Sequence, residues 1–410
     1  MNPNELPMTS AGVEQEAEPE VQSRGEPSRL GSMRRTRQAE SALTGIAFLA
    51  LFCAYALWLG TRFVNVDARV LDVHTNVPIL LLGLAVLVTL VAGLFDLSVA
   101  GMCTLTTFLT VGLTTNQHLP FGLIIAICMV IGVVGGVING LLVEKLQVNA
   151  FIATLGTGGI FTGISAVYSK GTQVVPLAGG TQLPGWFSEL GAYGTKAPSW
   201  ILWVATAILV VAAVAALDRA RPAKRSPRVW RIWEAGVVVV VGVVLVVGLS
   251  FSEWIADASW LVTILVAVSV LLWVVIDHTT FGRHLRAIGS NREAARLAGV
   301  PVRVEVVKAF ALGGALAALA GILLAANQGS ASPDIASSFL LPAFAAAFLS
   351  TVVFSAGRFT VFGTVLGGMF VAWTSQGLIV GGVPPTWAEI VNGVVLVSAV
   401  ALSSVIRRRN

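Results

Sequence analysis

Apolar runs of about 20 residues, separated by short polar segments, recur along most of this chain. A helix needs roughly that length to cross the hydrocarbon core of a bilayer, where backbone polar groups must be satisfied internally. The sequence therefore predicts an all-α fold, a polytopic transmembrane helix bundle of about 12 spans. The second and third runs could instead form one element that is broken around Asp96. The candidate runs lie near residues 43–62, 76–95, 98–115, 121–143, 150–168, 200–217, 235–251, 259–276, 306–326, 339–355, 360–380 and 388–405.

Composition favours a membrane protein over a soluble one. Only 11% of the 410 residues are charged and 56% are hydrophobic, whereas a soluble domain carries about 25% charged residues. The formal net charge of +5 does not indicate a nucleic-acid partner, because the basic residues lie between the apolar runs. We therefore expect a lipid membrane as the surroundings and no nucleic acid as a partner.

The distribution of Lys and Arg predicts the orientation of the bundle. If the N-terminus is cytoplasmic and the runs alternate in direction, the connecting segments on the external side of the membrane hold only four of the 26 basic residues. Positively charged segments resist translocation, so both termini are predicted to be cytoplasmic, in agreement with an even number of spans. The four residues expected outside are Arg62, Arg69, Lys170 and Lys196.

Polar stretches complete the predicted domain organisation. Residues 1–40 lack the apolar density to fold, so we expect a disordered cytoplasmic tail. Residues 41–405 form the transmembrane domain, with a basic cytoplasmic loop at 218–234, and residues 406–410 form a basic cytoplasmic tail.

A second cytoplasmic loop, at residues 278–305, carries the signals of a short, rigid helix. Ser290 is a candidate N-cap, with Glu293 three residues later in the spacing of a capping box. Gly299 suits the position just after the helix, and Pro301 prevents its continuation. An ordinary basic connector is the alternative. A helix capped at both ends outside the bilayer could instead dock into a soluble partner.

The same loop resembles a known family. The stretch that begins at Gly282-Arg283, continues through Ala287-Ile288-Gly289 and Asn291, and ends with Glu293 to Val300 is similar to the cytoplasmic signature of ribose/xylose-type sugar permeases. These belong to the ribose and branched-chain amino acid permease family of ABC importers. The likeness extends over roughly residues 70 to 405. Further matching stretches are Gly93–Val99, Asn139–Leu142, Ala150–Gly156, Gly363–Gly367 and Asn392–Leu396.

The resemblance implies a set of partners. They are two ATP-binding subunits, a periplasmic or lipid-anchored substrate-binding protein, and a second permease copy, all at the bacterial inner membrane. The chain contains no G-x-x-x-x-G-K-[ST] phosphate loop. We therefore expect it to be no enzyme and to bind no cofactor, with ATP held by the partner subunit. The solute would be a monosaccharide, with a pentose such as xylose or ribose favoured.

The resemblance also makes the short helix at 290–299 the element that meets the ATPase. The residues that it assigns to this coupling are Gly282, Arg283, Ala287, Gly289, Asn291, Glu293, Ala294, Ala295, Arg296 and Gly299.

Polar residues inside the apolar runs are candidates for the solute path. An intramembrane carboxylate such as Asp96 is a functional candidate by default. The neighbouring Gly93 and Ser98 favour a broken helix whose second part is capped by Asp96, so capping and a role near the solute both stay open. For the asparagines the alternative is packing hydrogen bonds. The path candidates are Asp96, Ser98, Asn139, Phe151, Thr154 and Asn327.

Other functions remain possible from the sequence alone. An ion-coupled secondary transporter is one, although that class usually needs several charged groups at mid-membrane. An ABC permease of the same family for nucleosides, amino acids or a signalling molecule is another. The four histidines form no set with the spacing of a metal or catalytic site, so no metal is expected.

Overall fold

The computed structural model describes residues 50, 52–176, 181–198, 200, 258–353 and 358–408. Within these ranges the regular structure is helical, apart from two isolated bridges that pair Val174 with Ala331 and Lys196 with Ser259. The predicted all-α fold is confirmed. Several predicted segments lie wholly or largely outside the described residues, namely the tail at 1–40, the first part of the run at 43–62, the runs near 200–217 and 235–251, and the loop at 218–234.

Seven helices of the described residues are long and apolar enough to cross a membrane, and two more helices contain shorter apolar stretches. The seven are α3 (Val66–Val91), α4 (Ser98–Thr115), α5 (Phe121–Glu144), α6 (Ala150–Ser169), α11 (Trp260–His278), α14 (Val302–Gln328) and α16 (Val361–Val380). The two with shorter apolar stretches are α15 (Leu340–Val353) and α17 (Trp387–Arg408). The short elements are α2 (Thr61–Val64), α7 (Gly185–Gly191), α12 (Thr280–Ser290), α13 (Arg292–Leu297) and the 3₁₀ turn η1 (Ser337–Phe339).

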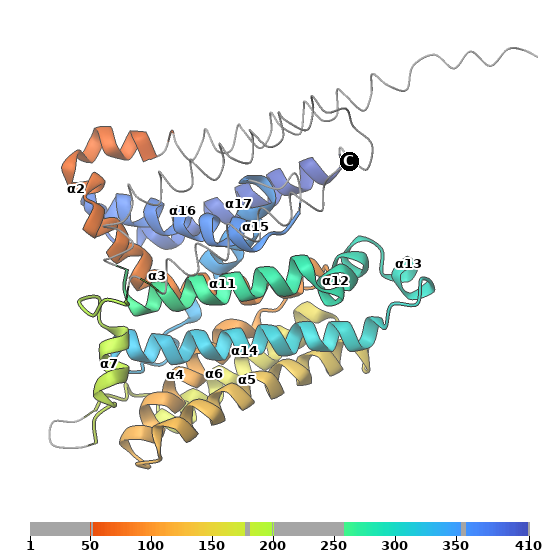
Figure 1. The fold of residues 1–410 in the computed structure, drawn as a ribbon, viewed down its shortest axis with the longest axis horizontal. Coiled ribbons are helices and arrows are strands. Elements are labelled where there is room, and N and C mark those ends of the chain that lie inside the picture. Colours follow the sequence, from red (N-terminus) through yellow and green to blue (C-terminus); the bar gives the residue numbers. More distant parts are fainter. Residues whose placement is uncertain are drawn as a thin grey trace, which may run out of the picture.

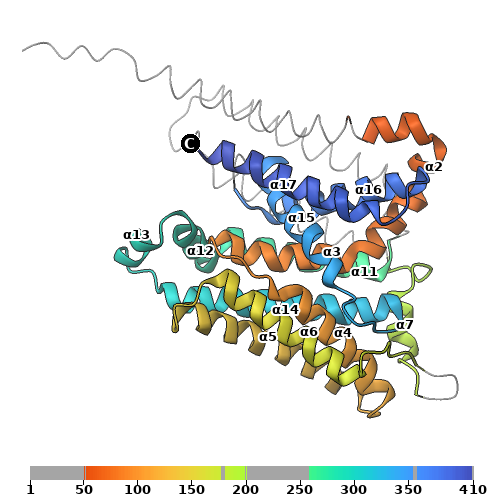
Figure 2. The same ribbon diagram turned by 180° about the vertical axis from the view of Figure 1, so that it is seen from behind.

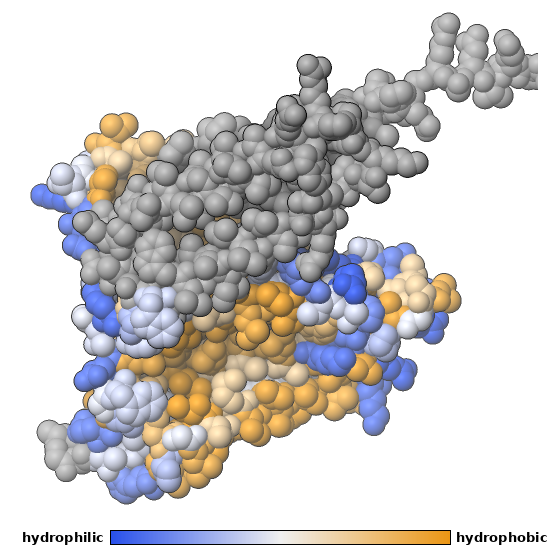
Figure 3. All heavy atoms as spheres, viewed as in Figure 1, coloured by the Kyte–Doolittle hydropathy of each residue, from blue (hydrophilic) through white to orange (hydrophobic). Residues whose placement is uncertain are grey.

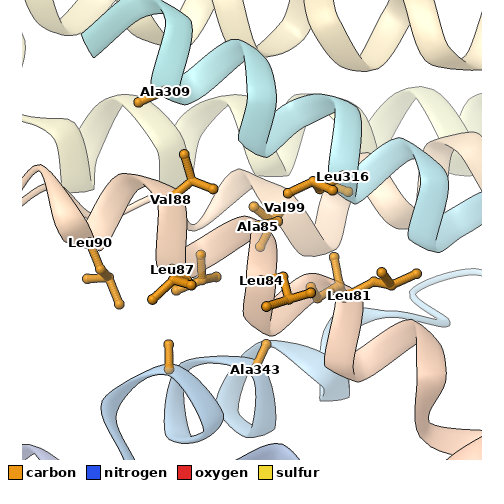
Figure 4. Packing of buried hydrophobic residues seen from close by; sticks show 14 of the residues in the cluster. Leu81, Leu84, Ala85, Leu87, Val88, Leu90, Val99, Ala309, Leu316 and Ala343 are labelled. Carbon is orange, nitrogen blue, oxygen red and sulfur yellow. The ribbon is translucent and has the colours of Figure 1, made fainter. Parts of the chain in front are cut away.

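Helix α3 lies at the centre of the bundle. It begins ten residues before the predicted run, because polar residues of its first turns are buried and paired; Arg69, for example, forms an ion pair with Asp72 at 3.0 Å. Further along, nearly every side chain is buried whichever way it points, as expected for a helix that is apolar all round. Figure 4 shows Leu84 and neighbouring α3 side chains between α14 and α15.

The helical backbone is interrupted between α3 and α4, at residues 92–97, here called the α3–α4 break. Gly93 has a φ of 77°, a left-handed conformation that glycine adopts without strain. Irregular backbone follows, and α4 begins at Ser98. The second and third runs are therefore two separate helices, and Asp96 lies in the connection between them.

Glycines of α5 bring that helix close to α14. A Cβ atom at Gly132 would lie 2.6 Å from the carbonyl oxygen of Gly314, and one at Gly140 would lie 2.7 Å from the Cα of Val307. A Cβ at Gly136 would overlap the carbonyl oxygen of Phe310. This repeat of glycines every four residues thus serves helix packing within the chain.

The bundle has two distinct ends (Figures 1 and 2). Helices α12 and α13 lie at one, here called the α13 end, and α7 lies at the other, the α7 end. Figure 3 shows an apolar surface between the two ends and polar side chains gathered at both. This is the pattern expected of a bundle that crosses a membrane.

Candidate coupling site and polar network

The α13 end contains a second helix that the sequence analysis had placed in a loop. Helix α12 forms because Leu285 and Ile288 lie on one face and are buried against the bundle, with Phe281 partly buried beside them. Their spacing of three and four residues is the signal that could have predicted this helix. The loop at 278–305 is thus two short helices joined at Asn291.

The N-cap of α13 is Asn291, and the expectation of Ser290 is wrong. The Asn291 backbone is extended, and its Oδ1 accepts a hydrogen bond of 2.9 Å from the Ala294 amide. Ser290 still belongs to α12, where its hydroxyl donates to the Arg286 carbonyl oxygen at 2.9 Å. Because α12 continues through Ser290, the chain turns one residue later than the sequence pattern indicated.

The other end of α13 is closed as predicted. Gly299 has a φ of 84° and donates its amide to the Arg296 carbonyl oxygen at 3.0 Å. The Val300 amide donates to the Ala295 carbonyl oxygen at 3.1 Å. These two bonds form a Schellman motif, which satisfies carbonyls of the last turn and fixes the length of the helix.

Two contacts fix the α12–α13 unit to the membrane helices. Arg292 of α13 forms an ion pair with Glu144, the buried last residue of α5. Gly289 of α12 lies against the end of α3, so closely that a Cβ there would overlap the Val91 carbonyl oxygen. Because Gly289 also faces Gly93, α12 rests directly on the break between α3 and α4.

Further ion pairs fix how α12 meets its neighbours. Arg286 pairs with Asp277 near the end of α11. Glu305, in the first turn of α14 and 5% exposed, accepts from His284 at 3.2 Å and pairs with Lys308 at 3.5 Å. Helix α12 is therefore joined to the last turn of α11 and to the first turn of α14.

The opposite face of α13 is exposed. Glu293 and Arg296 form an exposed pair at 2.5 Å, and the hydrogen bond from Arg296 lowers the pKa of Glu293 below its ordinary value. Leu297 is 78% exposed, although it is a large apolar side chain. The exposed face of α13 therefore carries one ion pair and one large apolar side chain.

The remaining predicted coupling residues divide between the two faces of this unit. Those turned toward the bundle are Gly282, which lies against the backbone of Ile276, and Ala287 and Ala295, which pack on the core. Those exposed to the surroundings are Arg283 and Ala294.

Four of the six path candidates come together in a buried network. Asp96 Oδ1 accepts from the Ser98 amide at 2.9 Å and from the Ser98 hydroxyl at 2.6 Å. The Ser98 hydroxyl accepts from Asn139 of α5 at 2.8 Å, and Asn139 Oδ1 accepts from Thr157 of α6 at 2.7 Å. Thr154 of α6 accepts from the Leu97 amide at 3.0 Å.

The network ties the start of α4 to α5 and α6. Asp96 is fully buried and, from the position before the N-cap residue Leu97, satisfies the backbone amide of Ser98, the first residue of α4. Its second oxygen, Oδ2, has no hydrogen-bond partner among the described residues. Capping therefore has direct geometric support, and a role near the solute stays a prediction.

The other two path candidates lie elsewhere. Phe151 is 51% exposed on the surface of α6. Asn327 lies near the end of α14, where its amide nitrogen is 3.1 Å from His74 Nε2. It belongs to the α7 end, because His74 also contacts the Gly191 carbonyl oxygen at 3.1 Å.

Sequence reasoning missed the cluster around His74, a residue that lies just before the predicted run at 76–95. His74 is 2% exposed inside α3, and its Nδ1 is 2.7 Å from the Ser259 hydroxyl. The cluster joins α3, α7, α11 and α14 at the α7 end. No spacing in the sequence links these distant residues, although the polar residues that open α3 were a sign that its first turns are paired.

Comparison with known proteins identifies the family. The family model described as "Branched-chain amino acid transport system / permease component" matches residues 73–221 and 229–400. The chain belongs to this permease family. The resemblance noted in the sequence is confirmed, and the match includes the α12–α13 unit and the helices that carry the polar network.

Several import permeases are similar to this permease. The galactose/methyl galactoside import permease protein of Escherichia coli is 31% identical over 286 residues, which cover 70% of this chain and 68% of that protein. The ribose import permease protein of E. coli is 26% identical over 322 residues, 78% of this chain and 79% of that protein. The fructose import permease protein of Rhizobium meliloti is 24% identical over 369 residues, 90% of this chain and 86% of that protein. No solved structure was found to match the chain.

Proposed function

We propose that this chain is the membrane-spanning permease of an ABC importer for a monosaccharide, driven by ATP hydrolysis on a separate subunit. The observation that carries the proposal is the capped helix α13, which is exposed on one face and tied to α5 by the Arg292–Glu144 pair on the other. The similar permeases named for galactose, ribose and fructose import support a sugar as the solute. A pentose remains the favoured solute from the resemblance in the sequence.

The α13 end is assigned to the cytoplasm. Basic residues Arg283, Arg292, Arg296 and Arg303 lie on or beside α12 and α13, and positive charge is retained on the cytoplasmic side. With the nine described apolar helices and the three runs near 43–62, 200–217 and 235–251, the chain has about 12 spans and cytoplasmic termini. The membrane is then the bacterial inner membrane.

Coupling follows from the two contacts of the α12–α13 unit. When the ATP-binding subunits close, each grips the α13 of one permease copy by its exposed face, which carries Arg296 and Leu297. The displaced unit pulls on Glu144 of α5 and pushes through Gly289 on the break before Asp96. Both routes reach the same buried network, because α5 carries Asn139 and the break carries Asp96. The network is thus where cytoplasmic motion enters the membrane helices.

Three kinds of partner complete the importer. They are ATP-binding subunits at the α13 end, a periplasmic or lipid-anchored substrate-binding protein at the α7 end, and a second copy of this permease. The chain itself needs no cofactor for this role, since the ATP belongs to the partner.

The test is uptake and ATP hydrolysis by the permease reconstituted with its ATP-binding subunits and binding protein. Glu293→Arg places like charge beside Arg296 on the exposed face of α13. We expect uptake of labelled sugar to fall about tenfold, because the exposed face of α13 loses its negative charge and becomes wholly positive, while hydrolysis continues. Glu293→Asp keeps a carboxylate beside Arg296, so it is the matched control and should keep uptake. Unchanged uptake in Glu293→Arg would count against the coupling role of α13.

Uptake by the chain alone separates the importer from an ion-coupled transporter. Liposomes that contain only this permease and carry a proton or sodium gradient should accumulate none of galactose, ribose, xylose or fructose. Accumulation under those conditions would support the ion-coupled function instead.

A further inference from the structure

A pocket lies between α3, α15, α16 and α17, in the half of the bundle nearer the α7 end. Its position follows from Asn76, one of the lining residues, which lies two positions after His74, the residue in contact with α7. The free volume inside is about 100 Å³, and the pocket is open on one side. A small solute could therefore contact its walls without being enclosed.

Four polar side chains from three helices line this pocket. Ser375 donates its hydroxyl to Asn392 Oδ1 at 3.1 Å, and Asn76 donates its amide to the Asp72 carbonyl oxygen at 2.8 Å. In the part of the chain that the structure describes, the side-chain amide of Gln376 makes no hydrogen bond. The side-chain atoms Asn392 Nδ2 and Asn76 Oδ1 are also unpaired there. The pocket thus offers donors and acceptors together, which suits hydroxyl groups because each hydroxyl both donates and accepts.

No charged side chain is among the eleven residues that line the pocket. The rest of the wall is apolar, with Ile79, Val371 and Ile379 among its members. A charged solute would lose hydration here without gaining a partner. A neutral sugar can pack its apolar C–H groups against this wall and form hydrogen bonds from its hydroxyls to the side-chain amides of Asn76, Gln376 and Asn392.

We propose that this pocket is a contact site for a neutral, hydroxyl-rich solute that enters from the α7 end. The proposal rests on the proposed function and deepens it, because it names Asn76, Ser375, Gln376 and Asn392 as the contacts. It also excludes amino acids and phosphorylated sugars from this site on chemical grounds.

Cysteine labelling in the complete importer tests whether solute reaches the pocket. The exposed native cysteine among the described residues, Cys53, is first replaced by serine, and the resulting Cys53→Ser protein is the background for the labelling variants. Gln376→Cys is then treated with a neutral, hydrophilic, membrane-impermeant methanethiosulfonate reagent. We expect labelling to slow about fivefold when a transported sugar is present at about four times its dissociation constant. L-leucine and D-ribose 5-phosphate should not slow it.

Gln328→Cys is the matched control, since Gln328 is an exposed glutamine at the end of α14 and does not line the pocket. Its labelling rate should not respond to sugar. Absence of labelling at Gln376→Cys would overturn the proposal, because the pocket would then face lipid or a second copy. Labelling that no transported sugar slows would overturn it as well.

Two substitutions give a readout in transport. Gln376→Leu and Asn392→Leu should each raise the sugar concentration needed for half-maximal uptake about tenfold, while Gln328→Leu leaves it unchanged. Unchanged uptake in both pocket variants would overturn the proposal. If the unmodified complex takes up none of galactose, ribose, xylose or fructose, the proposed function fails. If it does take one up and that sugar leaves Gln376→Cys unprotected, only the pocket assignment fails.

Discussion

Arg292 and Glu144 form an ion pair although 148 residues separate them in the chain. Arg292 belongs to the exposed helix α13, and Glu144 is the last residue of α5, with only 2% of its surface exposed. A carboxylate buried this far needs a charged partner, and losing that partner is strongly unfavourable. The pair therefore fixes α13, the proposed docking element, to a membrane helix.

A charge swap tests this link. Arg292→Glu places two carboxylates together, and we expect sugar uptake per ATP hydrolysed to fall about tenfold as the unit separates from α5. Glu144→Arg should do the same. The double variant restores opposite charges and should recover uptake to within about threefold of the original. Reconstituted uptake and phosphate release give the ratio, and a double variant no better than either single one would contradict the link.

The contact of α12 with the α3–α4 break gives a second prediction. Gly289→Ala adds a methyl group where the Val91 carbonyl oxygen lies, so α12 must move, at a loss of about 1–3 kcal/mol in stability. Gly159→Ala in α6 is the matched control, because nothing lies within 4 Å of its added Cβ. Thermal unfolding in detergent measures both. Equal stability of the two variants would show that α12 does not rest on the break.

The role of Asp96 can be separated into capping and charge. Asp96→Asn keeps an oxygen that accepts from the Ser98 amide, so we expect normal protein levels and uptake within about threefold of the original. Asp96→Ala removes the acceptor and should lower stability by about 1–2 kcal/mol. Protein level and uptake are measured together. Loss of uptake in Asp96→Asn at an unchanged protein level would instead show that the carboxylate charge is used in transport.

The corrected cap of α13 predicts different effects for two neighbouring residues. Asn291→Ala removes the acceptor of the Ala294 amide and should destabilise α13 by about 1 kcal/mol. Ser290→Ala removes only a hydroxyl bonded within α12 and should change stability by less than about 0.5 kcal/mol. Hydrogen exchange of the α13 amides is the measurement. Faster exchange in Ser290→Ala than in Asn291→Ala would restore Ser290 as the cap.

Much of the fold could be predicted because a helix that crosses lipid requires a continuous apolar run, which is visible in the sequence. The run at 98–115 and the helix α4 have the same bounds. The start of α3 was misplaced because Arg69, Asp72 and His74 are polar in sequence but paired inside the structure. Local pattern shows which residues are polar and not which distant residue will pair with them.

The candidate site shows the same limit. The end of α13 at Gly299 followed from local rules, since the left-handed glycine and the proline lie only two positions apart in the chain. The pair of Arg292 with Glu144 and the approach of Gly289 to Val91 depend on how helices pack. Asp96, Ser98, Asn139 and Thr154 were found as polar residues in apolar runs, but their joining into one network needed the structure.

The most direct measurement of the central claim is the accessibility of Leu297 from each side of the membrane. Leu297→Cys in the Cys53→Ser background is treated with an impermeant thiol reagent, in intact cells and in inside-out vesicles. We predict labelling only in inside-out vesicles, and protection of the thiol when the ATP-binding subunits are bound. Labelling from the outside of intact cells would place α13 on the wrong side and would contradict its role as the docking element for an ATPase.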